Sequence, residues 1–110
     1  MSDNRLPTSL LVDAVIRRCD IEFKPIYIIQ KGNHSGGTIM LKQNALSLGC
    51  QVLSQIRNLD GDIEWMKAFE DGNVDEIKAD EYIQRQISRD RDLWVLEIED
   101  KEMKNPFEDE

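Results

Sequence analysis

The sequence has 110 residues and a formal net charge of −8, with 40% hydrophobic and 33% charged residues. A chain of this length fits one domain that buries roughly 65% of its unfolded surface, and this hydrophobic content excludes a disordered chain. No apolar stretch approaches the roughly 20 residues of a membrane span, and no basic start followed by an apolar run resembles a signal peptide. We therefore expect a cytoplasmic protein without a membrane partner.

The charge is unevenly distributed along the chain. Residues 1–57 hold seven basic against four acidic side chains, a net charge of +3, whereas residues 58–110 hold seven against eighteen, a net charge of −11. The acidic total repels nucleic-acid phosphates unless the basic residues gather on one face, so RNA binding ranks last. Cys19 and Cys50 have no paired spacing and lie on predicted apolar faces, so we expect free thiols and no cofactor.

The first predicted element is an amphipathic helix from about Thr8 to Asp20. Its apolar side chains recur at helical spacing on one stripe: Leu11, Val12, Val15, Ile16 and Cys19. Arg17 and Arg18 are adjacent basic residues and candidates for a partner surface. An exposed pair of this kind beside acidic residues is more often only solvated.

Residues 25–30 and 38–42 are β-branched and apolar runs, and they predict a hairpin whose flexible tip is the glycine-rich loop 31–37. Glycine amides can converge on an anion, which makes Lys31 and His34 candidate surface residues. The loop lacks the spacing of a phosphate-binding loop and leads into a strand. His34 is the only histidine and has no second His or Cys nearby in sequence, so no metal site is predicted.

The middle of the chain predicts an antiparallel meander. Residues 50–57 alternate between the two faces of a half-buried strand, and the turn at 58–61 ends in Asp-Gly. Residues 62–69 then return as the next strand. The turn at 71–73 ends the meander, and Asn73 is spaced from Glu76 as a helix cap.

The last two elements are a short helix and a buried strand. The apolar phase breaks before Ala79, so we expect a turn at 74–78 and a helix only from about Asp80 to Ser88. Residues 93–98 form a strand whose alternate side chains Trp94, Leu96 and Ile98 share one dry face. We expect this strand to lie centrally in the sheet and to form the core.

These elements predict the α+β class, with an antiparallel sheet of about five strands and both amphipathic helices packed on one face. Residues 1–100 are expected to form a single domain, and residues 101–110 an acidic, disordered C-terminal tail. In the alternative, Phe107 packs on the domain or anchors a partner.

Three motifs carry a resemblance to a known family: VxAxxRRC at 12–19, KG…GG at 31–37 and, most specifically, YIxRQxxxDxDLWVxEIED at 82–100. With these motifs the chain resembles an uncharacterised family of small proteins, known chiefly from Alphaproteobacteria as a domain of unknown function. The resemblance covers roughly residues 5–100 and implies a bacterial, cytosolic, single-domain protein. The resemblance implies no particular activity, substrate or cofactor. Arg91 stands where a proline is expected, which loosens the turn.

The helix-to-strand corner of the third motif is the main candidate site. Its polar side chains are Arg85, Gln86, Asp90 and Asp92. In the structural interpretation they form a local ion network that fixes the corner. In the functional interpretation Arg85 and Gln86 bind a ligand, with the two aspartates as acids.

Two classes of function follow. The first is a non-enzymatic module that docks a protein partner through its positive hairpin surface or an exposed sheet face. It is favoured because the histidine is isolated and neither cysteine has a base nearby in sequence. The second is a small ligand-binding or metal-dependent enzyme that uses Arg85, Gln86, Asp90, Asp92 and Glu97. Convergence of these side chains in a concave pocket would favour the enzyme.

Overall fold

The structure is a computed structural model that describes residues 7–108. Its elements in chain order are α1 (Thr8–Ile21), β1 (Ile26–Gln30), β2 (Ile39–Asn44), the short 3-10 helix η1 (Leu46–Leu48), β3 (Cys50–Arg57), β4 (Ile63–Lys67), α2 (Glu76–Arg89) and β5 (Trp94–Glu99). The α+β class and the five strands are therefore confirmed. No helix among residues 7–108 is long and apolar enough to cross a membrane.

The five strands form one sheet in the order β1-β5-β2-β3-β4. The last strand of the chain lies between the first two, antiparallel to β1 and parallel to β2. The predicted antiparallel sheet is therefore wrong in one respect, because the sheet is mixed, and the predicted hairpin of β1 and β2 does not form. The physical reason is that residues 93–96 are all buried, so β5 needs a neighbour on both sides.

The glycine-rich loop 31–37 crosses the beginning of β5 in close contact. A Cβ on Gly32 would lie 2.2 Å from the carbonyl oxygen of Asp92, and one on Gly37 would lie 2.1 Å from the same atom. Asn33 accepts a hydrogen bond of 2.8 Å from Trp94 Nε1, and its backbone N–H donates to the Asp92 carbonyl at 3.0 Å. The loop is therefore not the tip of a hairpin as predicted but packs against β5, and two of its glycines allow this backbone approach.

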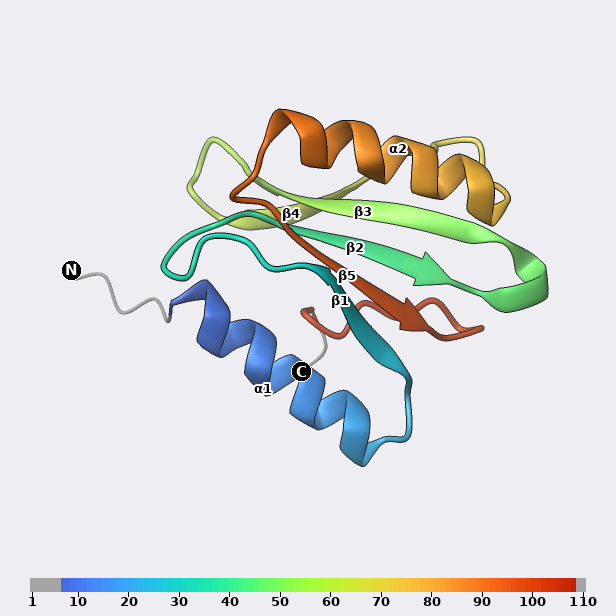
Figure 1. Ribbon diagram of the computed structural model, residues 1–110, viewed down its shortest axis with the longest axis horizontal. Coiled ribbons are helices and arrows are strands. Elements are labelled where there is room, and N and C mark those ends of the chain that lie inside the picture. Colours follow the sequence, from blue (N-terminus) through green and yellow to red (C-terminus); the bar gives the residue numbers. More distant parts are fainter. Residues whose placement is uncertain (1–6, 109–110) are drawn as a thin grey trace.

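The core has two layers, one on each face of the sheet. On one face Trp94, Leu96 and Ile98 pack with the apolar stripe of α1, and on the other Val95 packs with Ala79 and Ile83 of α2. Figure 1 shows the sheet between the two helices. The helices thus lie on opposite faces and not on one face as predicted, because β5 is apolar on both sides. The predicted burial of Trp94 is confirmed, since it is only 5% exposed.

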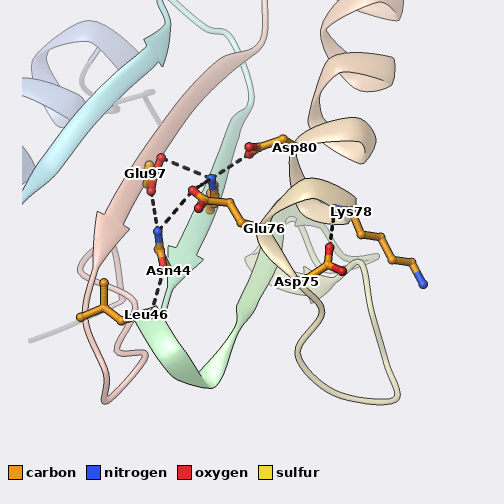
Figure 2. A network of polar contacts seen from close by, with 8 residues as sticks. Asn44, Leu46, Asp75, Glu76, Lys78, Asp80 and Glu97 are labelled. Carbon is orange, nitrogen blue, oxygen red and sulfur yellow. Dashed lines mark hydrogen bonds and ion pairs between the residues drawn. The ribbon is translucent and has the colours of Figure 1, made fainter.

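The meander of β3 and β4 forms as predicted, with Leu53 opposite Lys67 and Arg57 opposite Ile63. Helix α2 begins earlier than predicted, at Glu76. Its N-cap is Asp75 and not Asn73, and the Asp75 carboxylate accepts a hydrogen bond of 2.8 Å from the backbone of Lys78 (Figure 2).

The segment after β5 lies against the domain. Gln43 Nε2 donates to the carbonyl of Met103 at 2.7 Å, and Arg18 donates to the carbonyl of Pro106. Phe107 packs on Trp65, with ring centroids 5.6 Å apart. Of the arrangements considered for this segment, the structure has the one in which Phe107 packs on the domain.

Candidate functional site

The residues of the predicted helix-to-strand corner do not form one site. Arg85 and Gln86 lie near the end of α2, and Asp90 Oδ1 accepts a hydrogen bond of 2.9 Å from the backbone of Asp92. Within residues 7–108 no ion pair joins Arg85 to either aspartate. Glu97 lies elsewhere, beside the first turns of α2. The described residues therefore show no ion network at this corner, and the enzyme alternative stays a prediction.

The four basic candidates of the first half of the chain are divided between two places. Arg17 is exposed on α1, and Arg18 holds the C-terminal segment. Lys31 and His34 lie together beside a hollow of about 230 Å³, lined by Ser9, Asp13, Ile28, Lys31, Gly32, His34 and Trp94. The Nδ1 atom of His34 lies 2.8 Å from the hydroxyl of Ser9. Of these four candidates, only Lys31 and His34 therefore line the same hollow.

The loop 31–37 is not a cradle for an anion. The backbone amides of Ser35 and Gly36 both donate to the side-chain oxygen of Asn33, at 2.9 and 3.1 Å. The amide of Gly37 donates to the Asn33 carbonyl at 3.4 Å. Since these amides already have acceptors inside the loop, they are not free to converge on a phosphate.

A group of polar and charged residues that the sequence analysis did not bring together surrounds Lys42 of β2. We call Lys42, Glu76, Asp80, Glu97 and Asn44 the Lys42 cluster. The Lys42 ammonium, whose side chain is 2% exposed, lies 2.7 Å from Glu76 Oε2, 2.7 Å from Asp80 Oδ1 and 3.4 Å from Glu97 Oε1. Figure 2 shows the carboxylates of α2 and of β5 turned toward one point.

The pairing of two strands and the periodicity of α2 bring the residues of the Lys42 cluster together. Lys42 and Glu97 are opposite each other in the parallel pairing of β2 and β5, and Glu76 and Asp80 are four residues apart on one face of α2. Asn44 Nδ2 donates to Glu97 Oε2 at 2.9 Å, and Asn44 Oδ1 accepts from the backbone of Leu46 at 2.8 Å. The cluster thus ties two strands and one helix to each other.

The electrostatics of the cluster favour the charged form of Lys42. Burial alone would lower its pKa, but the hydrogen bonds to Asp80 and Glu76 and the charge of Glu97 outweigh burial and raise the pKa above its ordinary value. The ammonium donates hydrogen bonds to Glu76 and Asp80 and forms an ion pair with Glu97 at 3.4 Å. Such a group is neither a nucleophile nor a base.

The second unusual region is the outer margin of β1. This strand has a neighbour only on its β5 side within residues 7–108 and has the sequence IYIIQ, with no charged residue. Tyr27 is 50% exposed, Ile28 37% and Ile29 39%, and the patch continues to Ile21 and to Phe23, which is 92% exposed. We call these five residues the β1 edge.

The two margins of the sheet differ in how they are protected. The opposite margin, β4, carries Glu64 and Lys67. Charged side chains of this kind keep edge strands from pairing with other chains. The β1 edge has only a register shift at Ile29, and Phe23 beside it adopts a φ of 60°, a backbone conformation that bulky residues rarely adopt.

Comparison with known proteins places this fold in a family. A family model described as a protein of unknown function (DUF1491) matches residues 6–108. The chain belongs to the DUF1491 family. The comparison with curated proteins finds no match.

Solved structures of DUF1491 proteins share the fold. The crystal structure of a family member from Caulobacter crescentus is 28% identical, with a TM-score of 0.80 and 94% of each chain covered. The NMR structure of a family member from the same organism is 27% identical, with a TM-score of 0.78 and coverage of 92% of this chain and 91% of that one. Protein Atu0922 from A. tumefaciens, 21% identical with a TM-score of 0.71 over 87% of this chain and 86% of its own, supports the fold alone. Both organisms are alphaproteobacteria.

Proposed function

We propose that this protein is a small non-enzymatic interaction module of the bacterial cytoplasm, which binds a protein by adding a β-strand to the β1 edge. The observation that carries the proposal is an uncharged edge strand with exposed apolar side chains. Natural proteins protect such edges, because an edge strand is a template for pairing with another chain. An edge strand without charged side chains is suited to strand addition.

The chemistry of strand addition fits the β1 edge. On the outer side of an edge strand, alternate residues direct N–H and C=O groups outward, and a partner strand satisfies them. Exposed side chains then give specificity. Tyr27 pairs with Glu97 and Ile28 pairs with Leu96 in the ladder of β1 and β5. Because Tyr27 and Ile28 are consecutive in the strand, their side chains project from different faces of the sheet, and each can contact a partner strand on its own face.

The remaining polar groups support a non-enzymatic role. Lys42 is protonated and has its acceptors within the chain. The thiols of Cys19 and Cys50 are buried, and burial raises the pKa of each, which makes them poor nucleophiles. The side chains proposed for the enzyme alternative do not meet in a pocket.

The test is photo-crosslinking in the native bacterium with p-benzoylphenylalanine at position 27, and at position 66 of β4 as the control. We expect specific protein adducts from position 27 only, and we expect Ile29→Lys to abolish them. The matched variant Met66→Lys places the same charge on the opposite edge at a side chain that is 52% exposed, and it should leave the adducts intact. Equal adducts from both positions would contradict the proposal.

A further inference from the structure

We propose that the strand added to the β1 edge is β1 of a second copy of this chain, which makes the protein a two-fold symmetric dimer. This inference rests on the proposed function of the β1 edge and names its partner. The two strands pair antiparallel about an axis near Ile28, perpendicular to the sheet. The two five-stranded sheets then become one sheet, with both α1 helices on one face and both α2 helices on the other.

The charges at the two ends of β1 match in this arrangement. Asp20 and Glu22 are exposed just before the strand, and Lys31 and His34 are exposed just after it. Antiparallel pairing brings the acidic beginning of one strand to the basic end of the other, and symmetry makes the contact twice. Within residues 7–108 Lys31 has no ion pair, and Glu22, whose side chain is 43% exposed, has only a contact of 3.9 Å with Lys24 Nζ of its own chain, so the two charges can face each other across the dimer.

The apolar surfaces match in the same way. Phe23 projects from the connection between α1 and β1, while the hollow of about 230 Å³ lies at the other end of β1, between α1 and Trp94. In the antiparallel dimer the Phe23 ring of one copy reaches the hollow of the other, on the α1 side of the joined sheet. There it packs against Ile28 and lies close to the Lys31 ammonium, a favourable contact for a cation and an aromatic ring.

The overall acidity of the chain does not oppose this contact. The net charge of −8 comes from residues 58–110, which hold −11, whereas residues 1–57, which contain α1 and β1, hold +3. Lys24 at the beginning of β1 is already paired with Asp100 of its own chain at 3.3 Å. The segment 7–37, which holds α1, β1 and the loop after it, has four basic and three acidic side chains, so these elements carry no net negative charge that would repel a second copy.

The first experiment is sedimentation equilibrium over a range of concentrations. We expect a monomer–dimer equilibrium for the wild type, and for Ile29→Lys a dimer dissociation constant at least about 100-fold higher, because the symmetric contact then buries two added charges. Met66→Lys should leave the dissociation constant within about 2-fold of the wild type, the spread expected of a surface substitution.

Two further variants test the register and the charge match. Ile28→Cys lies at the proposed axis and should form a disulfide-linked dimer under mild oxidation, whereas Met66→Cys should not; Cys19 and Cys50 are each only 1% exposed and do not compete. Lys31→Glu should weaken the dimer about 10-fold. Glu22→Lys combined with Lys31→Glu should restore it, because the exchanged charges again face each other.

A wild type that stays monomeric at the highest concentration overturns the dimer. If position 27 then crosslinks a different protein in the cell, the proposed function stands while this inference fails. A dimer that survives Ile29→Lys and lacks the Ile28→Cys disulfide places the contact elsewhere and overturns the inference as well.

Discussion

The Lys42 cluster and the β1 edge each reverse the usual distribution of side chains. The cluster places a charge inside the protein, and the edge places apolar groups outside. Lys42 finds its three carboxylates within its own chain, whereas the β1 edge has no neighbour strand among residues 7–108 to complete it. The difference teaches that a buried charge with partners in its own chain is explained by the fold, whereas the fold alone gives no reason for the open apolar edge, and the proposed strand addition would supply one.

The largest expected effect is that of removing the cation from the Lys42 cluster. Lys42→Met leaves three carboxylates facing one another without their cation, and we expect the free energy of unfolding to fall by about 3 kcal/mol. Lys67→Met on the exposed β4 should change it by less than about 0.5 kcal/mol. Urea unfolding followed by Trp fluorescence measures both. Equal effects of the two substitutions would show that the cluster contributes no more than a surface lysine.

The next effect concerns the loop that fixes the end of the β1 edge. Gly32→Ala drives a Cβ into the Asp92 carbonyl, 2.2 Å away, and we expect a loss of about 2 kcal/mol. Gly36→Ala is the matched control, because a Cβ there meets nothing within 4 Å. Thermal unfolding should separate the two variants clearly. A similar melting temperature for both would mean that the loop can move away from β5 at little cost.

A smaller effect concerns the beginning of the β1 edge, which Lys24 ties to Asp100. Burial would raise the Asp100 pKa, but hydrogen bonds from the backbones of Glu102 and Lys104 and the Lys24 ammonium outweigh it and hold the pKa below the ordinary value of an aspartate. Asp100→Asn should cost about 1 kcal/mol at neutral pH.

The pH dependence of that cost follows from the direction of the shift. A carboxylate whose pKa is lower in the folded state stabilises the fold above its unfolded pKa and loses this contribution as the pH falls through the folded value. The difference between wild type and Asp100→Asn should therefore be constant above a pH of about 4 and shrink below it. Urea unfolding at several pH values gives the curve, and a difference that grows with acid would contradict the assignment.

The smallest expected effect is that of a substitution on the β1 edge on the free energy of unfolding. Ile29→Thr on the β1 edge should change the unfolding free energy of dilute protein by less than about 0.5 kcal/mol, because the side chain is not part of the core. Val95→Thr, at a position that is 0% exposed in the central strand, should cost about 2 kcal/mol. A large loss at Ile29 would mean that β1 is held by contacts within the chain.

Local patterns predicted much of this fold, and contacts between distant residues account for the rest. The strand at Trp94, the helix after Thr8 and the β3–β4 hairpin depend on periodicity and turn residues that lie next to one another in sequence. The insertion of β5 between β1 and β2 depends on pairing across some 60 residues, which no local pattern contains. For the same reason Gly32 was interpreted as flexible, since the carbonyl that it must approach belongs to Asp92.

The candidate regions were predicted unevenly. Lys31 and His34 do share one hollow, but Arg85 and Glu97 were grouped by their nearness in sequence and lie at different ends of α2. Lys42 is not singled out in the sequence analysis, because a lysine in a strand is usually exposed. The signal that could have found the Lys42 cluster is a charge of opposite sign in each of two buried strands, with two acids four residues apart on the neighbouring helix.

The position of β5 has a consequence for how the protein is made. Both neighbours of this strand, β1 and β2, are synthesised before it. Until β5 has been synthesised, both core layers lack the side chains that it contributes, Trp94 in one layer and Val95 in the other. A nascent chain that ends before residue 94 lacks the central strand of its sheet, so the sheet can be completed only after residues 94–99 have left the ribosome. Before β5 is added, the apolar strands would be exposed to chaperones that bind such segments. A chain truncated before residue 94 would keep these strands exposed.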